Sequence, residues 1–207
     1  MSQLTPDIFP FDQDPFDLFL QELKAAEDAG MKEPNAMTLA TVSAMGQPRA
    51  RTVFFKGYSD GENSKGFRFF TNYDSDKANE MSRGRAGLLF HWNLLERQVR
   101  IEGRVEKTSR EESEAYFRTR PRISQLGAWS SEQSREIPNH KWLEDRFESF
   151  EAKFAGGEVP CPPHWGGYRV IPLEFEFWIA RAGRMHERYV YQRLSDTDGW
   201  RRFMRSP

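Results

Sequence analysis

Residues Tyr116–Ser134 read YFRTRPRISQLGAWSSEQS, and the helix signals in and around this stretch predict two helices that meet at a proline. Upstream, Ser109 and Glu112 have the S-x-x-E spacing of a capping box, which predicts a helix start. Pro121 should end that helix and open a second one, because its missing N–H costs nothing at a first helical position. The second helix would then direct free N–H groups at whatever the neighbouring side chains face.

The side chains of this stretch are typical of an anion site. Arg118, Arg120 and Arg122 stand two residues apart, and Ser124 follows them. A guanidinium, a hydroxyl and a helix N-terminus together can bind a phosphate group. The alternative is a solvated corner between two helices with incidental arginines, and the stretch alone leaves both interpretations open.

This stretch resembles the signature region of the pyridoxamine (pyridoxine) 5′-phosphate oxidases, the FMN enzymes that make pyridoxal phosphate. Further motifs that resemble this family follow one another in its order from about Asp14 to the C-terminus: RTVFFK (Arg51–Lys56), FFTNYDSDKA (Phe69–Ala78), LERQVRIEG (Leu95–Gly103), WGGYRV (Trp165–Val170), EFW (Glu176–Trp178) and RMHERYVYQR (Arg184–Arg193). Most of these motifs are weak singly, but together they cover nearly the whole chain and make the resemblance strong.

Composition narrows the class of protein. The formal net charge of −1 over 207 residues does not support a general attraction to nucleic acid, so arginine clusters are interpreted as local sites. The single cysteine, Cys161, cannot form an internal disulfide and favours a reducing compartment. No signal peptide is recognisable and no apolar run approaches membrane-spanning length, so we expect a cytoplasmic protein without membrane contact.

Hydrophobic periodicity predicts a mainly β chain with interspersed helices. Besides the two helices above, we expect one after the N-cap and first-turn pair Asp14-Pro15, one from Ser75 to Arg83, and one from about Lys141 to Ala155. The expected strands are Met37–Ser43, Arg49–Tyr58, Phe67–Thr71, Ala86–Trp92, Gln98–Lys107, Tyr168–Ala180, Arg184–Arg193 and Trp200–Met204.

Short strands joined by hairpin turns favour an antiparallel barrel with helices outside it. The resemblance implies more: an FMN-binding split β-barrel with peripheral helices, formed as a single domain by residues 1–207. Residues 1–13 lack periodicity and are expected to be a mobile N-terminal arm.

The chain's own catalytic groups are few. There is no G-x-G-x-x-G motif, no P-loop and no nucleophile elbow, and the four histidines have no metal-ligand spacing, so no metal site is expected. These absences suit a protein whose chemistry is carried by a bound cofactor. Arg184, His186 and Arg188 alternate along an expected strand, which would place them on one face, opposite an anion or in solvent.

The resemblance implies roles for individual residues. Arg184 and His186 would lie over the pyridine ring of the substrate as its catalytic pair, fixing ring orientation and charge. Lys56, Tyr116, Arg120 and Ser124 would form a cradle for the substrate phosphate, with Arg184 and His186 completing the substrate contacts. The implied FMN contacts are Arg51, Lys56, Phe70, Thr71, Lys77, Gln98, Gln133, Ser134, Trp178 and Arg188.

Arg51 and Lys56 are five residues apart, so a regular strand would put them on opposite faces. If both serve one ligand pocket, one of them must lie at a strand end or past a bulge; alternatively, the two serve adjoining anions. The resemblance favours two anions, because FMN and the B6 substrate each carry a phosphate. It also implies a homodimer with FMN at the subunit interface, hydride transfer from the substrate C4′ to flavin N5, and reoxidation by O2 with release of H2O2.

The sequence departs from the family pattern at two places. Asp76 stands where the family usually has a basic residue beside the FMN phosphate, so we hypothesise that Asp76 turns outward and that FMN binds more weakly than usual. Met204-Arg205 replaces the family's Arg-Leu pair near the C-terminus, which leaves the role of Arg205 open.

Two other functions compete with the B6 oxidase. One is a split-barrel flavoprotein that acts on another substrate, although a substrate without phosphate would not need the proposed cradle. The other is a binding module that holds nucleic acid or pyridoxal phosphate without catalysis. The net charge disfavours nucleic acid, whereas a pyridoxal phosphate carrier stays open.

Overall fold

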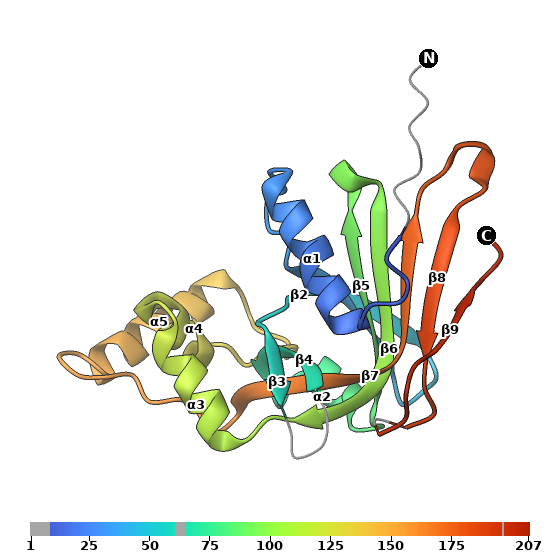
Figure 1. Ribbon diagram of the computed structural model, residues 1–207. Coiled ribbons are helices and arrows are strands. Elements are labelled where there is room, and N and C mark those ends of the chain that lie inside the picture. Colours follow the sequence, from blue (N-terminus) through green and yellow to red (C-terminus); the bar gives the residue numbers. More distant parts are fainter. Residues whose placement is uncertain (1–8, 61–64, 196) are drawn as a thin grey trace.

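The computed structural model describes residues 9–60, 65–195 and 197–207 (Figure 1). These residues form a nine-stranded sheet in which every pairing is antiparallel. Its strands are β1 (Ala36–Val42), β2 (Pro48–Phe54), β3 (Tyr58–Asp60), β4 (Lys65–Asn72), β5 (Arg85–Trp92), β6 (Arg97–Lys107), β7 (Trp165–Ile179), β8 (Glu187–Gln192) and β9 (Arg201–Met204). The helices are α1 (Pro15–Asp28), α2 (Asp76–Met81), α3 (Arg110–Thr119), α4 (Arg122–Ser130) and α5 (His140–Lys153), with 3-10 turns η1 (Asn93–Leu95) and η2 (Ala182–Arg184).

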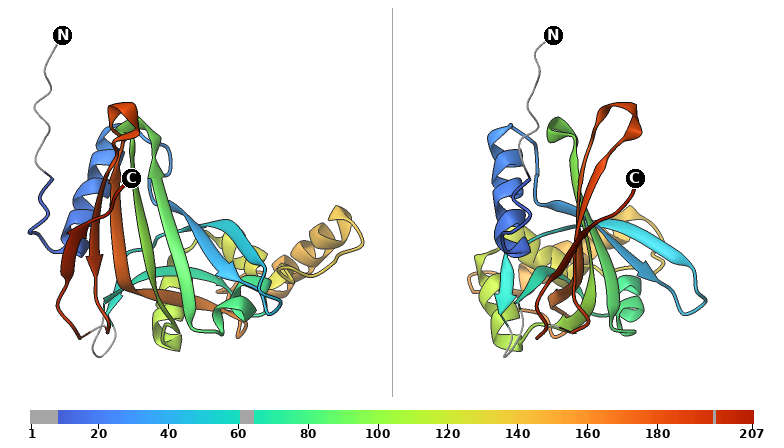
Figure 2. Two further views of the ribbon diagram at one scale, coloured as in Figure 1. Left: turned by 90° about the vertical axis from the view of Figure 1, so that its right-hand side faces the viewer. Right: turned by 45° about the vertical axis from the view of Figure 1, so that its right-hand side comes forward.

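The sheet is strongly bent but does not close into a barrel (Figure 2). Its order is β2-β1-β5-β6-β7-β4-β3, with β8 on β7 and β9 on β8. The 15-residue strand β7 organises it, because β4 pairs with its first half, β8 with its second half, and β6 with almost all of it. A register shift between Glu102 and Gly103 bends the β6–β7 pair. The predicted mainly β fold with peripheral helices is confirmed.

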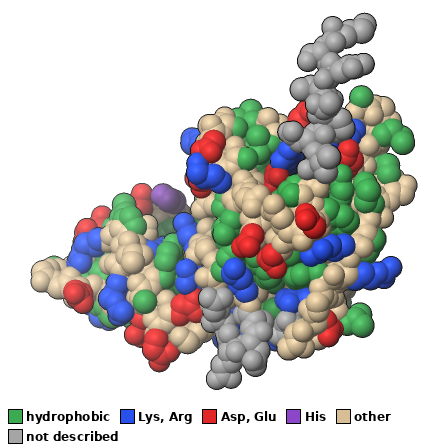
Figure 3. Space-filling model, viewed as in Figure 1, with side chains coloured by type: hydrophobic (Ala, Val, Ile, Leu, Met, Phe, Trp, Pro, Cys, Tyr) green, Lys and Arg blue, Asp and Glu red, His purple; other side chains and the backbone are tan. Residues whose placement is uncertain are grey.

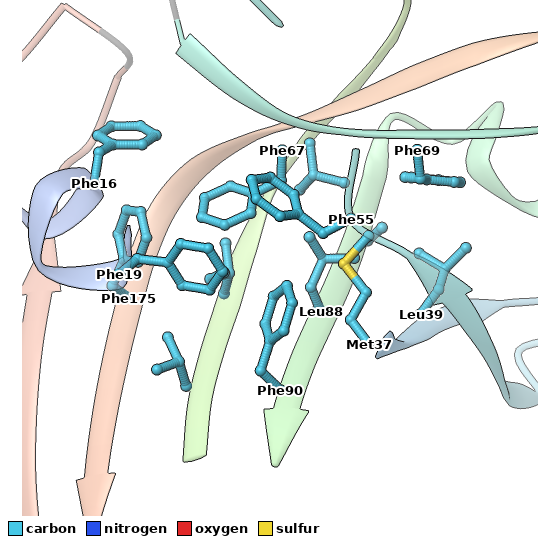
Figure 4. Packing of buried hydrophobic residues seen from close by; sticks show 14 of the residues in the cluster. Phe16, Phe19, Met37, Leu39, Phe55, Phe67, Phe69, Leu88, Phe90 and Phe175 are labelled. Atoms are coloured by element: carbon cyan, nitrogen blue, oxygen red, sulfur yellow. The ribbon is translucent and has the colours of Figure 1, made fainter. Parts of the chain in front are cut away.

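Aromatic side chains fill the core between α1 and the sheet (Figure 4). Asp14 Oδ1 accepts a hydrogen bond from Phe16 N at 2.9 Å, as the N-cap prediction requires. The helix then buries Phe19, whose ring lies 4.8 Å from that of Phe67 and 4.7 Å from that of Phe90.

On the outer surface in Figure 3, basic and acidic side chains are interspersed.

Helices α3, α4 and α5 lie together beside the sheet (Figure 1) and have a small core of their own. Trp165, at the start of β7, is buried in it against Phe117 of α3. The next two residues are glycines packed closely against other side chains: a Cβ on Gly166 would lie 2.1 Å from the Tyr73 hydroxyl and 2.8 Å from Oγ of Ser113 on α3, and one on Gly167 would lie 2.4 Å from Thr108 Oγ1. The WGG motif therefore joins the helical part of the chain to the sheet.

The observed elements differ from the predicted ones at three places. β2 ends at Phe54, so the expected strand 49–58 is split into β2 and β3. Pro121 is the N-cap of α4, not its first helical residue. β8 begins at Glu187, because Gly183 (φ 66°) and Arg184 (φ 62°) are in the left-handed region, which cannot continue a strand.

Residues 1–8 of the expected N-terminal arm lie outside the described residues. Phe9 and Phe11 pack on β8: the Phe9 ring is 4.1 Å from that of Tyr189, and the Phe11 ring is 5.1 Å from that of Tyr191. Within the described part of the chain, no helix is long and apolar enough to cross a membrane.

Candidate functional site

A cavity of about 440 Å³ lies between the β2 and β4 region of the sheet and the helices α3 and α4. It brings together all four residues predicted for the substrate-phosphate cradle and several predicted for the cofactor. These are Lys56, Phe70, Thr71, Lys77, Tyr116, Arg120, Ser124 and Gln133. Segments far apart in the sequence therefore meet here.

Stacked aromatic rings form one wall of this cavity. The rings of Phe70 and Tyr116 are nearly parallel, with centroids 4.0 Å apart, and the Trp165 ring is parallel to that of Phe70 at 5.3 Å. Trp165 was not predicted as a site residue, although the aromatic residue directly before two close-packed glycines was a usable signal. The stack gives the site a rigid, flat wall.

Arg120 carries a partly buried charge that the described residues do not neutralise. Its Nη1 is buried without a hydrogen-bond partner, and none of the described carboxylates lies within 4.0 Å of its guanidinium. The group stacks on Trp165 at 4.8 Å from the ring centroid, and burial lowers the pKa of Arg120. An unpaired donor in such a place costs about 1–3 kcal/mol, which an anionic ligand would offset.

Lys56 and Ser124 add a second charge and a hydroxyl to the same cavity. Lys56 follows the end of β2, and none of the described carboxylates pairs with its ammonium group. Ser124 lies in the first turn of α4, and its N–H donates to the Pro121 carbonyl at 2.8 Å, so its hydroxyl is the donor that it offers to the cavity. Lysine, arginine and a hydroxyl in one cavity favour a phosphate ligand.

A further polar group lies where β4, α2 and the segment after α4 meet. Gln133 Oε1 accepts hydrogen bonds from Lys77 Nζ at 2.8 Å and from Thr71 Oγ1 at 2.9 Å. Burial is the main cause of the lowered pKa of Lys77. A partly desolvated ammonium group in a cavity is well suited to an anion.

Arg51 lies beside this group but does not line the cavity. Its Nη2 is 2.9 Å from Glu80 Oε2, and its Nη1 donates to the Thr41 hydroxyl. Asp76, the departure from the family pattern, is paired: its Oδ2 accepts from Arg49 Nη1 at 2.8 Å. Lys56 lies past the end of β2, which the alternative of one shared pocket required. Arg51 nevertheless does not line the cavity that Lys56 lines.

Other predicted cofactor residues gather at another part of the sheet. Gln98, Trp178 and Arg188 are lateral neighbours on β6, β7 and β8, and the His186 ring lies 4.6 Å from that of Trp178. Arg188 is held by Glu176, with its Nη2 2.9 Å from Oε2. This second group lies near the β7–β8 turn, apart from α3 and α4 (Figure 1), and none of its members lines the cavity.

Besides Arg51, two predicted site residues belong to neither group. Arg184 is exposed in η2, so the expected alternation of Arg184, His186 and Arg188 along one strand is wrong. Ser134 is exposed with φ 70° and does not line the cavity.

The arginine of the altered C-terminal tail has a defined place. Arg205 Nη1 lies 2.7 Å from Glu176 Oε2 and 3.1 Å from Glu174 Oε1. Glu176 thus forms ion pairs with both Arg188 and Arg205, and so links the C-terminal tail to the second group.

Comparisons with known proteins identify the family to which the chain is similar. The chain matches the family models "Pyridoxamine 5′-phosphate oxidase" over residues 23–154 and "Pyridoxine 5′-phosphate oxidase C-terminal dimerisation region" over residues 165–207. A pyridoxine/pyridoxamine 5′-phosphate oxidase from Cupriavidus taiwanensis is 51% identical, covering 94% of this chain and 89% of the relative. One from Bdellovibrio bacteriovorus is 47% identical, covering 97% of this chain and 100% of the relative.

Solved structures show the same architecture. PhzG from Burkholderia lata 383, in complex with tetrahydrophenazine-1-carboxylic acid, has a TM-score of 0.85 at 29% identity, covering 97% of this chain and 98% of the other. An FMN binding protein from Nostoc punctiforme has a TM-score of 0.72 at 17% identity, covering 94% and 99%, which supports the fold alone. The split-barrel fold class predicted from the sequence is confirmed. Within this fold the sheet is open, because the edge strands among the described residues do not pair with each other.

Proposed function

Because the chain belongs to the pyridoxamine 5′-phosphate oxidase family, we propose that it is an FMN-dependent oxidase that converts pyridoxamine 5′-phosphate or pyridoxine 5′-phosphate to pyridoxal 5′-phosphate. The observation that carries the substrate class is the unpaired, partly buried guanidinium of Arg120. It shares its cavity with Lys56 and Ser124, beside the wall of stacked aromatic rings. A planar ligand with a phosphate group fits these surroundings.

The residues present also fit FMN. Lys77 is a partly desolvated cation beside the amide of Gln133, which suits the cofactor phosphate. Trp178 and Gln98 offer a flat apolar surface and an amide that can both donate and accept hydrogen bonds at the polar edge of a flavin. Bound FMN would supply the two-electron chemistry, accepting a hydride from the substrate C4′ at N5 and passing the electrons to O2 to give H2O2.

We propose that the two groups of residues belong to shared sites in a homodimer, with FMN at the interface. In one chain the cavity and the Trp178 group are separate, so neither is a complete site. The matched C-terminal dimerisation region, residues 165–207, includes Trp178, Arg184, His186 and Arg188. A second copy would bring this region to the cavity.

The phosphate-binding residues would align the substrate by contacts remote from the reacting carbon. Lys56, Tyr116, Arg120 and Ser124 hold the phosphate, and that binding energy orients the ring with its reacting carbon about 3–3.5 Å from the acceptor. The phosphate contacts therefore affect turnover as well as affinity.

Arg184 and His186 would orient the pyridine ring from the second subunit. His186 Nδ1 accepts a hydrogen bond from the backbone N–H of Arg181 at 3.2 Å. The neutral imidazole therefore carries its proton on Nε2, which makes Nε2 a hydrogen-bond donor toward the substrate. Arg184 would add a positive charge at the ring.

A product assay with matched substrates tests this proposal. FMN-loaded protein would be given pyridoxamine 5′-phosphate, pyridoxine 5′-phosphate or pyridoxamine in air, and pyridoxal products and H2O2 would be measured. We expect equal amounts of aldehyde and H2O2 from the phosphorylated substrates and much slower turnover of pyridoxamine. Equal turnover without the phosphate, or no turnover of either phosphate, would refute the assigned substrate class.

A further inference from the structure

Arg68, on β4, connects to the phosphate-binding cavity without lining it. Its Nε and Nη2 donate hydrogen bonds to the carbonyl oxygen of Lys56 at 3.0 and 2.6 Å. In return, Lys56 N donates to the Arg68 carbonyl at 2.8 Å. The Arg68 side chain therefore binds the C=O of Lys56, and the Arg68 main chain binds its N–H.

Lys56 lies between two strands, where the main chain turns. β2 ends at Phe54, and Gly57 turns the chain with φ 81° before β3 begins at Tyr58. Main-chain hydrogen bonds join this turn to β4, from Lys56 N to the Arg68 carbonyl and from Arg68 N to the Gly57 carbonyl. The Arg68 guanidinium adds the two donors to the Lys56 carbonyl, and of these hydrogen bonds only those two are lost when the side chain is replaced.

Glu112 anchors the same guanidinium to α3. Arg68 Nη1 lies 2.7 Å from Glu112 Oε1, and the two side chains are only 24% and 25% exposed. Glu112 Oε2 also accepts a hydrogen bond from Ser59 Oγ at 2.9 Å. Tyr116, which lines the cavity, lies one helical turn further on the same helix face.

A second contact runs through the aromatic wall. The Arg68 guanidinium lies 5.7 Å from the centroid of the Phe70 ring, which stacks on Tyr116 at 4.0 Å. One side chain thus joins the strand end that carries Lys56 to the helix that carries Tyr116 and has Arg120 as its C-cap.

We propose that Arg68 and Glu112 are positioning residues for the phosphate-binding part of the site. They fix the Lys56 ammonium in the cavity with Tyr116 and Arg120, and so set the affinity for ligands that carry a phosphate. This inference rests on the proposed function, because it assigns the cavity to the phosphate of a B6 substrate.

A double-mutant cycle tests the inference. Binding of 4-deoxypyridoxine 5′-phosphate and of 4-deoxypyridoxine, which the enzyme cannot oxidise, would be measured by calorimetry on FMN-loaded wild type, Arg68→Ala, Lys56→Met and the double variant. We expect Arg68→Ala to raise the Kd of the phosphorylated ligand about tenfold and to leave that of the other ligand unchanged. In the Lys56→Met background the same substitution should have little further effect, because Arg68 acts through Lys56.

Milder variants keep the test valid if Arg68→Ala does not fold. Arg68→Lys retains the charge opposite Glu112 but cannot also make both hydrogen bonds to Lys56, so it should lose part of the phosphate affinity. Glu112→Gln should cause a smaller loss in the same direction. The matched control is Arg169→Ala, because Arg169 faces Arg68 in the β4–β7 register and is ion-paired with Glu106 at 2.6 Å, yet does not line the cavity.

The outcomes separate this inference from the proposed function. Wild type that does not prefer the phosphorylated ligand would overturn the proposed function and the inference together. Wild type that prefers it, with Arg68→Ala and Arg68→Lys unchanged, would overturn the inference alone. Equal increases in the Kd of both ligands would show a general structural effect and would also overturn the inference. The same holds if the Kd increase in the double variant equals the product of the two single-variant increases.

Discussion

Replacing Arg120 with methionine should weaken ligand binding without lowering the stability of the ligand-free protein. The guanidinium is partly buried, lacks a carboxylate partner among the described residues and has a buried Nη1 without an acceptor. Hydrogen bonds to charged groups contribute about 1.5–3 kcal/mol, and each 1.4 kcal/mol is about a tenfold change in Kd. Arg120→Met should therefore raise the Kd of 4-deoxypyridoxine 5′-phosphate roughly 10- to 150-fold.

The stability of the ligand-free protein should respond differently. Arg120 stacks on Trp165, a contact worth about 0.5–2 kcal/mol, but its unpaired donor costs about 1–3 kcal/mol. Methionine keeps an apolar contact with the ring and removes the unpaired donor. The free energy of unfolding should thus stay within about 1 kcal/mol of the wild-type value or rise.

Calorimetric titration and urea unfolding of the same preparations would check both expectations. Arg118→Met is the matched control, because Arg118 is an exposed arginine in the same last turn of α3 and does not line the cavity. An unchanged Kd in Arg120→Met, a Kd equally raised in Arg118→Met, or a loss of affinity explained by unfolding would refute the reasoning.

Three further predictions concern the cofactor and the sheet. Burial lowers the pKa of Lys77, and a bound phosphate would raise it again. FMN affinity should therefore fall as pH rises through the lowered pKa. FMN titrations at several pH values should show that Lys77→Met loses this dependence. Asp76→Arg should lower the Kd of FMN about two- to fivefold, since it replaces an acid in the turn that carries Lys77, and an unchanged or higher Kd in a fluorescence titration would contradict this. Gly103→Ala should destabilise the fold by about 2–3 kcal/mol in urea unfolding, because the added Cβ would lie 2.1 Å from the Ile171 carbonyl oxygen, whereas Gly87→Ala, with its nearest atom at 3.7 Å, should cost far less.

Local signals predicted helix starts and hairpins well because they depend on neighbouring residues. Ser109 caps α3 as its S-x-x-E spacing indicated, with Ser109 Oγ accepting from Glu112 N at 3.1 Å. The turn before Pro48 joins β1 to β2, as predicted. The strand expected over Arg184–Arg193 is present as β8, but it begins only at Glu187, because the alternating pattern gave no sign that Arg184 adopts a left-handed conformation.

Long-range pairs could not be predicted from periodicity. Arg68 and Glu112 are 44 residues apart, and Arg49 and Asp76 are 27 apart, so no local spacing joins them. The resemblance implied a site at a subunit interface. Periodicity could not show which of the predicted residues one chain places in the cavity and which it places apart from it, since that depends on how β7 and β8 run across the sheet.

The most direct test of the proposed oxidase is a single anaerobic reduction. FMN-loaded protein would be mixed with pyridoxamine 5′-phosphate in the absence of O2 while the visible flavin absorbance is followed. We predict that the band bleaches and that it recovers when air is admitted, which would identify substrate, cofactor and acceptor in one experiment. A band that stays oxidised with both pyridoxamine 5′-phosphate and pyridoxine 5′-phosphate would contradict the proposed function.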